Sequence, residues 1–388
     1  MTLSVTRVLV CGAGIIGAAC ARELARAGFA VTVVDRGGPA GATTAHGEGN
    51  VLVSDKGPGP ELELARLSRR LWPEILDGLP NAETVEWEPK GGIVVATTTA
   101  GAEALTAFAA SQREAGVVAE PMDAAALAAA EPHVTRDFAA AVHYPEDAQV
   151  QPAGAATTLL TDAIRAGATL RTGCEILGAI TEGGRITGVR TSVGTFHAEV
   201  VINAAGPWSG EVAGRLGAPI DVRPRRGEVL VTTPMPPTVF HKVYDADYVG
   251  AVGSGAEELQ ASAVVESTRA GTILLGSSRR RVGFDERIRP EVLSVIAGKA
   301  LKLFPMLAGV QTMRAYGGFR PYVPDHLPVI GPDPRLPGLW HASGHEGAGI
   351  GLSAGTAALL RDLLLDKPPE IDAKPFRVDR PAVLGETA

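Results

Sequence analysis

The chain has 388 residues, 45% of them hydrophobic, enough to form a substantial core in two or three domains. Its 36 Lys and Arg against 43 Asp and Glu give a net charge of −7, and no basic run exceeds "SSRRR" at 277–281, which argues against nucleic acid as a partner. Three cysteines without a CxxC pair indicate a reducing compartment, with neither a disulfide nor a cysteine-based metal site.

Residues 8–21 are apolar and resemble the core of a signal peptide. Arg22, Glu23 and Arg26 follow at helical spacing and lead into a predicted strand, so we interpret this segment as the start of the fold. No apolar run approaches the roughly 20 residues that span a bilayer. We therefore expect a soluble, cytoplasmic protein without a transmembrane segment.

Residues 7–36 predict a strand, a tight turn, a helix and a second strand, with Gly12, Gly14 and Gly17 in G-x-G-x-x-G spacing. Gly12 permits the turn, Gly14 lets the backbone approach a pyrophosphate, and Gly17 lets the helix pack on the strand. Asp35 ends the second strand, where its carboxylate can accept hydrogen bonds from a ribose diol. This pattern predicts a dinucleotide site.

Asp35 would repel a 2′-phosphate, which leaves FAD or NAD as the cofactor. Residues 36–50 are small, polar and rich in glycine, and they predict an extended crossing instead of the next βα unit of an NAD domain. Such a segment favours FAD. The expected cofactor contacts of this region are Ile15, Ile16, Arg36, Thr43, Thr44, His46, Gly47, Glu48 and Gly49.

Hydrophobic periodicity and turn residues predict the remaining elements. Residues 169–206 should form a strand, two hairpin arms and a buried strand, 200–204, that completes the edge of the nucleotide-binding sheet. The other predicted elements are a helix over 60–79, a hairpin-like strand within 87–98, two helices within 100–131, a helix over 152–168, strands within 223–233 and 272–285, a helix over 290–304, strands at 327–331 and 338–344, and a helix from about Gly349 to Leu365.

These elements predict an α/β protein with two interleaved domains. A Rossmann-like FAD-binding domain is expected from residues 1–86, 150–222 and 325–388. An α+β substrate-binding domain, built on an antiparallel sheet, is expected from residues 87–149 and 223–324.

Four blocks carry a family resemblance: the first glycine loop with "VTVVDR" (31–36), "VINAAGPWSGEVAGRLG" (201–217), "GGFRPYVPDHLPVIGP" (317–332) and "GLWHASGHEGAGIGLSAGTA" (338–357). In this order, across nearly the whole chain, they resemble the D-amino acid oxidase family of FAD enzymes, which includes glycine oxidase and sarcosine oxidase. "GATTAHGEGNVLVSDK" and "GHEGAGIGLS" are similar to a branch with D-hydroxyproline dehydrogenase, hydrogen cyanide synthase and opine-oxidase-like flavoprotein subunits.

The resemblance implies that noncovalent FAD oxidises the C–N bond of a small amino acid, such as a D-amino acid, glycine, D-proline or hydroxy-D-proline. A hydride would pass from Cα to flavin N5, and the imine would hydrolyse to a 2-oxo acid or cyclise. The resemblance implies that Arg320 clamps the substrate carboxylate. Tyr244 and Tyr248, in the inserted sheet, either lie over the substrate or are core aromatics.

The resemblance also implies that a second glycine loop brings backbone N–H groups and a helix start to the pyrimidine edge of the flavin. Its His345 and Glu346 either contact the substrate or shape the loop. The expected cofactor contacts here and after the middle strand are Ala205, Gly206, Trp208, Gly344, His345, Glu346, Gly347, Gly349, Ile350 and Gly351.

Several alternatives stay open. His46 could hold the flavin covalently, as in relatives of dimethylglycine dehydrogenase, but those relatives carry the histidine at the position of Ala45. Glu48 either selects a positively charged substrate group or pairs with an arginine. The enzyme could be a sarcosine or N-methyl amino acid oxidase, an NAD dehydrogenase, or a flavoprotein subunit that works with small iron–sulfur or other electron-transfer subunits. The electron acceptor and the oligomeric state are not predicted.

Overall fold

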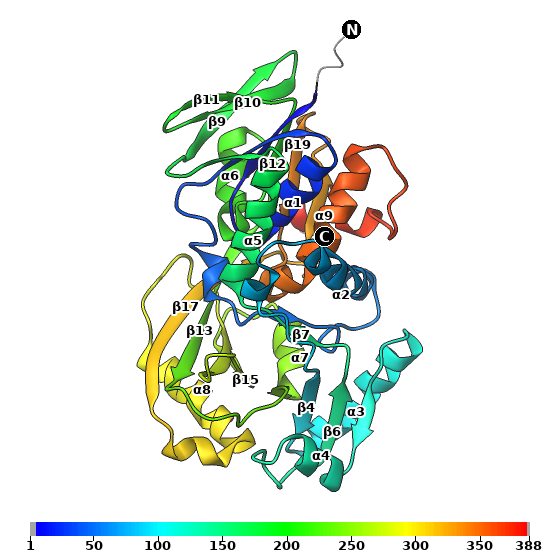
Figure 1. The fold of residues 1–388 in the computed structure, drawn as a ribbon, viewed down its shortest axis with the longest axis vertical. Helices are drawn as coiled ribbons and strands as arrows, with labels where there is room; N and C mark the ends of the chain where they lie inside the picture. Colours follow the sequence, from blue (N-terminus) through cyan, green and yellow to red (C-terminus); the bar gives the residue numbers. More distant parts are fainter. Residues whose placement is uncertain (1–4, 386–388) are drawn as a thin grey trace.

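The fold is known from a computed structural model that describes residues 5–385. Its upper part in Figure 1 contains a six-stranded sheet in the order β18-β19-β12-β1-β2-β8. Neighbouring strands are parallel except β18, which runs antiparallel to β19. The strands are β1 (Arg7–Cys11), β2 (Ala30–Val34), β8 (Thr169–Arg171), β12 (Val200–Asn203), β18 (Val329–Pro332) and β19 (Leu339–Ser343).

Helices with small buried residues pack beside this sheet. In α1 (Ile15–Arg26), which contacts both α5 (Pro152–Arg165) and α9 (Gly349–Leu364), alanines and a glycine face the core. A Cβ at Gly355 of α9 would lie 2.9 Å from Leu64 Cδ1 in α2 (Pro60–Asp77), so the glycine allows close helix packing. Helix α9, from the C-terminal part of the chain, therefore packs against α1 and α2 from the N-terminal part.

The lower part of Figure 1 contains an eight-stranded sheet in the order β17-β13-β16-β15-β14-β4-β6-β5. Its pairs are antiparallel except β14 with β4. Apolar residues of the sheet and of α8 (Pro290–Leu303) form a second core that includes Ile93, Val265 and Ile296. The strands are β4 (Gly92–Ala96), β5 (Glu120–Met122), β6 (Ala140–Tyr144), β13 (Arg223–Thr232), β14 (Lys242–Asp245), β15 (Gln260–Ser267), β16 (Ile273–Arg279) and β17 (Thr312–Tyr322).

The predicted fold class is confirmed, because a mainly parallel sheet and a mainly antiparallel sheet alternate along the chain. The domain boundaries stay a prediction. The two hairpin arms form a third sheet, and the predicted helices are present. The remaining elements are α3 (Thr99–Glu114), α4 (Ala124–Ala130), α6 (Ser209–Leu216), α7 (Asp247–Val252), α10 (Pro381–Leu384), β3 (Asn50–Val51), β7 (Ala148–Gln149), β9 (Ile176–Glu182), β10 (Arg185–Thr191) and β11 (Gly194–His197), with short 3₁₀ turns at Thr43–His46, Ala82–Val85, Gly206–Trp208, Pro305–Gly309, Glu346–Ala348 and Lys374–Phe376.

Two predicted strands sit in different surroundings from those expected. The strand from Val200 was expected at the edge of the nucleotide-binding sheet, but β12 lies between β1 and β19, and all four of its residues are buried. A strand buried on both faces is typical of the interior of a parallel sheet. The segment at 87–98 forms no hairpin, because β4 pairs with β6 and β14, which come from distant parts of the chain.

Two further expectations were wrong in local structure. Residues 36–50 are not extended throughout, because Thr43–His46 form a 3₁₀ turn. Tyr248 lies in α7 instead of the sheet, whereas Tyr244 lies in β14 as expected.

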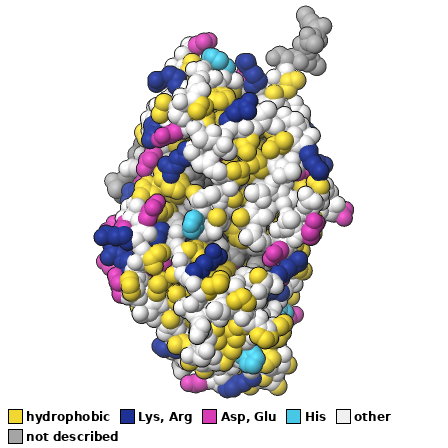
Figure 2. Space-filling model, turned by 60° about the vertical axis from the view of Figure 1, so that its left-hand side comes forward, with side chains coloured by type: hydrophobic (Ala, Val, Ile, Leu, Met, Phe, Trp, Pro, Cys, Tyr) yellow, Lys and Arg dark blue, Asp and Glu magenta, His cyan; other side chains and the backbone are white. Residues whose placement is uncertain are grey.

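Positive and negative side chains are interspersed on the face shown in Figure 2. Within residues 5–385, no helix combines the length and apolar character needed to cross a membrane. The three cysteines, Cys11, Cys20 and Cys174, are buried free thiols.

Candidate active site

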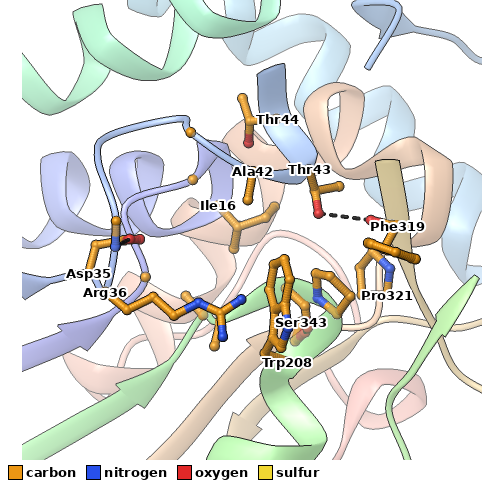
Figure 3. Close-up of a pocket in the computed structure, with 18 of the residues that line it drawn as sticks. Ile16, Asp35, Arg36, Ala42, Thr43, Thr44, Trp208, Phe319, Pro321 and Ser343 are labelled. Carbon is orange, nitrogen blue, oxygen red and sulfur yellow. Dashed lines mark hydrogen bonds between the residues drawn. The ribbon is translucent and has the colours of Figure 1, made fainter. Parts of the chain in front are cut away.

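A cavity of about 680 Å³ lies between the first sheet and β17. Its walls come from the first glycine loop, the segment at 34–46, the turn after β12, β17, and the second glycine loop (Figure 3). Its volume is in the range of cofactor and ligand sites. The cavity therefore joins segments from both ends and the middle of the chain.

The first glycine loop is shaped by backbone contacts. Gly12 has φ 123°, and a Cβ there would lie 2.4 Å from the Ala204 carbonyl oxygen. A Cβ at Gly17 would lie 1.9 Å from the Gly12 carbonyl oxygen. Gly14, Ile15 and Ile16 line the cavity, so the first turn of α1 opens onto it with its positive end.

The Asp35 carboxylate braces this loop. One oxygen accepts a hydrogen bond from the Ala13 amide and the other from the Gly37 amide, both at 2.7 Å. Each carboxylate oxygen has a second lone pair, so Asp35 can still accept a bond from a ribose diol. The Arg36 guanidinium lies 4.1 Å from the centre of the Trp208 ring, and both residues line the cavity.

Two threonines fix the segment between the glycine loop and β17. Thr44 Oγ1 accepts from the Ile15 amide at 3.0 Å, and Thr43 Oγ1 donates to the Phe319 carbonyl at 2.8 Å (Figure 3). His46 Nδ1 donates to the Ala42 carbonyl at 2.7 Å. The segment links the two sheets along one wall of the cavity.

An aromatic wall was missed at the sequence level. Trp208 stacks on Phe284, with ring centres 5.2 Å apart, and Phe284 meets Phe319 edge to face. Phe319, Pro321 and Arg226 line the cavity from the second sheet. No local motif marks Phe284, which lies just after the basic run at 277–281, so only the fold brings it to Trp208.

The second glycine loop opens α9 onto the same cavity. His345, Glu346 and Gly349 line it, and no side chain caps the start of the helix. His345 Nε2 bonds to Thr356 Oγ1 at 2.9 Å, while Nδ1 is buried without a partner among the described residues. Burial lowers the pKa of His345 to about 3, so the ring is neutral at physiological pH.

The glycines of this region serve close packing. A Cβ would lie 2.6 Å from Val323 Cγ2 at Gly344, 3.4 Å from Arg320 Nε at Gly347, and 3.0 Å from the Asn50 carbonyl oxygen at Gly351. Similarly, a Cβ at Gly49 would lie 1.9 Å from the Val150 carbonyl oxygen. These residues hold cavity walls together without lining the cavity.

The predicted cofactor residues thus fall into two groups. Those that line the cavity are Gly12, Gly14, Ile15, Ile16, Asp35, Arg36, Thr43, Thr44, His46, Ala205, Gly206, Trp208, His345, Glu346 and Gly349. Those that lie outside its lining are Gly17, Gly47, Glu48, Gly49, Gly344, Gly347, Ile350 and Gly351.

Arg320 lies beside the second loop and reaches across β13. A Cβ at Gly227 would lie 2.2 Å from Arg320 Nη1, which donates to the Ser278 carbonyl on β16 at 2.8 Å. Burial, and secondarily Arg279, lower the pKa of Arg320 to about 10, so the guanidinium remains charged at neutral pH. Gly227, which sequence reasoning missed, leaves room for this side chain.

The two candidate tyrosines differ in surroundings. Both belong to the main hydrophobic core, where Tyr244 donates to Ser54 Oγ. Tyr248 packs against it with ring centres 4.9 Å apart, and the Arg279 guanidinium lies 4.8 Å from the centre of the Tyr248 ring. Of the two tyrosines, Tyr248 is therefore the one that lies against Arg279.

The two candidate glutamates also differ. Glu346 accepts from Arg225 Nη1 at 3.1 Å and from His326 Nδ1 at 2.7 Å, so both of its oxygens are engaged. Glu48 is buried, and its Oε1 has no partner among the described residues. Glu346 is therefore held as a brace of its loop, and Glu48 forms no ion pair with a described arginine.

These features fit an FAD cofactor. Glycine turns give close approach, two helices begin at one cavity without a capping side chain from their own N-cap residue, and a buried His345 nitrogen lacks a partner among the described residues. Helix starts of this kind suit the pyrophosphate and the polar edge of a flavin.

Comparisons with known proteins agree with this geometry. The family model described as FAD dependent oxidoreductase matches residues 7–363. Glycine oxidase of Pseudomonas aeruginosa is 32% identical over 382 residues, which cover 95% of this chain and 98% of that protein. Hydrogen cyanide synthase subunit HcnC of the same organism is 28% identical over 414 residues, with 96% and 95% covered. The crystal structure of glycine oxidase from Geobacillus kaustophilus matches with a TM-score of 0.86 and 26% identity, covering 97% of this chain and 99% of that one.

Proposed function

Because the chain belongs to the family of FAD dependent oxidoreductases and is an amino-acid-oxidising enzyme, we propose that it acts on a small amino acid whose carboxylate is held by Arg320. The substrate would be a D-amino acid, glycine or a cyclic imino acid such as D-proline or hydroxy-D-proline. The observation that carries this proposal is the half-buried Arg320 guanidinium, which lies against Gly347 of the second loop and has a single hydrogen bond to the described residues.

When bound, FAD would accept a hydride from the carbon that bears the amine, and the resulting imine would hydrolyse to a 2-oxo acid. The protein's contribution is chiefly orientation. Arg320 can grip a carboxylate with two parallel N–H bonds, which fixes the direction of Cα–H. The uncapped start of α9 favours negative charge at the cavity wall that it forms.

No protein base is required if the amine arrives neutral. His345 and Glu346 of the second loop have side chains that could act as a base, but their surroundings do not suit them to accept a proton from the substrate. His345 is neutral, with Nε2 bonded to Thr356, and Glu346 is engaged by Arg225 and His326. We therefore assign them to holding the loop.

The test is reduction of the bound flavin under nitrogen, read as loss of its visible absorption, with glycine, sarcosine, D-alanine and D-proline. This readout does not depend on the natural electron acceptor. Bleaching by at least one amino acid supports the proposal, whereas a flavin that no amino acid reduces contradicts it. A preference for sarcosine would favour the alternative, an N-methyl amino acid oxidase.

A second candidate is the flavoprotein subunit of a heteromeric amine dehydrogenase. It is favoured by the similarity to HcnC, which is named as a subunit of hydrogen cyanide synthase. Rapid bleaching with slow oxygen consumption would support this reading, and equal rates of the two would oppose it.

A further inference from the structure

Arg279 differs from the other buried arginines. Of the five arginines that are buried within residues 5–385, four lie within 4.0 Å of a carboxylate, and Arg279, which is 3% exposed, does not. Burying a charge without a partner raises the free energy of the folded protein, and binding an anion beside Arg279 would offset this. The paired arginines are Arg22 with Asp162, Arg225 with Glu346, and both Arg226 and Arg280 with Glu228.

Arg279 lies next to Arg320. The Ser278 carbonyl that accepts the hydrogen bond from Arg320 precedes Arg279 in the chain. After burial, the nearby charge of Arg279 does most to lower the pKa of Arg320, as expected for two like charges that lie close together. Glu48 counters this repulsion but is not within ion-pair distance of either arginine.

Both guanidiniums keep unused donors. Arg279 Nη1 donates to Ser277 Oγ at 3.2 Å, and Arg320 Nη1 donates to Ser278. Nε and Nη2 of each have no hydrogen bond to a described residue, and these atoms are not among the fully enclosed polar atoms that lack partners. The Tyr248 ring covers one face of Arg279 and leaves the edge of its planar fork available.

We propose that the substrate carries a second carboxylate, which Arg279 binds while Arg320 holds the first. This inference rests on the proposed function, because it assigns Arg320 to the carboxylate of the oxidised amino acid. Two carboxylates would neutralise two adjacent guanidiniums that no protein carboxylate within residues 5–385 pairs with. The substrate class is thus a dicarboxylic amino acid, with the second acid on the side chain or on the nitrogen substituent.

The test uses inert analogues, so that binding is read without catalysis. Diglycolate, which has an ether oxygen in place of the amine, is compared with methoxyacetate, which lacks one of its carboxylates. Succinate is compared with propionate in the same way, for a side-chain acid. Calorimetric titration of the FAD-loaded protein should show at least one dianion binding about 100-fold more tightly than its partner, as expected for a buried charge-assisted pair.

Arg279→Met should reduce this affinity ratio to below about tenfold, and Arg279→Lys should restore part of it. Arg269→Met is the matched control, because Arg269 lies in the connection between β15 and β16 but is exposed and paired with Glu88. It should leave the ratio of the wild-type protein unchanged.

Equal affinity of dianion and monoanion for the wild-type protein would overturn the inference, even if the variants fail to fold. A ratio that survives Arg279→Met in a folded protein would also overturn it. Failure of the proposed function looks different: dianions bind tightly, yet neither dicarboxylic nor monocarboxylic amino acids bleach the flavin.

Discussion

The Arg320 side chain crosses directly over Gly227 to reach the Ser278 carbonyl, so that a Cβ on Gly227 would lie 2.2 Å from Nη1. Gly227 and Gly318 are opposite each other in the β13–β17 pair, two positions along from the pair of Arg225 with Arg320 and therefore on the same face of the sheet. Gly227, on the middle strand β13, thus determines where the Arg320 guanidinium of the neighbouring strand β17 lies.

Gly227→Ala should therefore displace the Arg320 guanidinium at little cost to the fold, because the obstructed atom is the end of a flexible side chain. We expect kcat/KM for the best amino acid to fall by roughly 10- to 100-fold through lost orientation. Flavin content and the thermal unfolding midpoint should stay close to wild type. A variant with normal kcat/KM would show that this placement of Arg320 is not required.

Arg320→Ala should remove most of the activity toward carboxylate-bearing substrates, by about 100-fold or more in kcat/KM, because the substrate loses a charge-assisted anchor. Arg320→Lys should recover only part of it, since an ammonium cannot form two parallel bonds. Steady-state kinetics with the visible flavin spectrum as a loading control checks this. Unchanged turnover in a flavin-loaded alanine variant would remove Arg320 from the site.

Acid precipitation should release all flavin into the supernatant, from the wild-type protein and from His46→Ala alike. The reason is that His46 is held by its bond to the Ala42 carbonyl and is assigned no covalent role. Yellow colour that stays in the wild-type pellet but is lost from the His46→Ala pellet would establish covalent attachment.

Thr44→Val should weaken FAD binding by about tenfold, because the Ile15 amide at the start of α1 loses its acceptor and Thr44 lines the cofactor cavity. The dissociation constant of FAD for apoprotein, from fluorescence titration, measures the effect. Thr106→Val is the matched control, because Thr106 is exposed on α3 and does not line the cavity. Equal affinities of Thr44→Val and wild type would argue against the assigned role.

Ionisation of Asp147 should lower the free energy of unfolding as the pH rises. Burial raises the pKa of this carboxyl to about 7, although it accepts bonds from Val53, Ser54 and the Ser54 hydroxyl. The pKa of this carboxyl is 3.8 in the unfolded chain and about 7 in the folded one, so between these pH values the folded state binds more protons. The stabilisation that protonated Asp147 gives to the folded state is therefore complete below pH 3.8 and is lost as the pH rises through 7.

Asp147→Asn should flatten this part of the pH dependence, because the amide cannot ionise, while its oxygen can still accept from the Val53 and Ser54 amides and its NH2 group can donate to Ser54 Oγ. Urea unfolding of both proteins at several pH values between 4 and 8 gives the two profiles. Other buried acids contribute equally to both, so the difference isolates Asp147. Parallel profiles would contradict the assignment.

The sequence predicted the first glycine loop well because its signal is local. The strand, the turn and the helix adjoin in the chain, and Gly17 meets Gly12 within that unit, although Gly12 itself lies against Ala204 from the middle of the chain. The family, the cofactor and the fold class followed from ordered blocks and are confirmed by the family match. The role of Arg320 came from the same resemblance and stays a prediction.

Long-range neighbours were not predictable in this way. Strand β12 was expected at a sheet edge because nothing near it in sequence shows that β19 pairs beside it. Arg279 appeared only as part of the basic run at 277–281, since its isolation from carboxylates depends on strands β13, β16 and β17 meeting in one sheet.

The arrangement of β1, β12 and β19 side by side has a consequence for synthesis on the ribosome. The cavity lacks a wall until β19 and the loop before α9 have emerged, and these begin at Leu339, close to the end of the chain. A nascent chain that already displays the first glycine loop therefore cannot hold FAD firmly. Cofactor loading is expected to follow emergence of α9, and proteins truncated before α9 should be recovered without flavin.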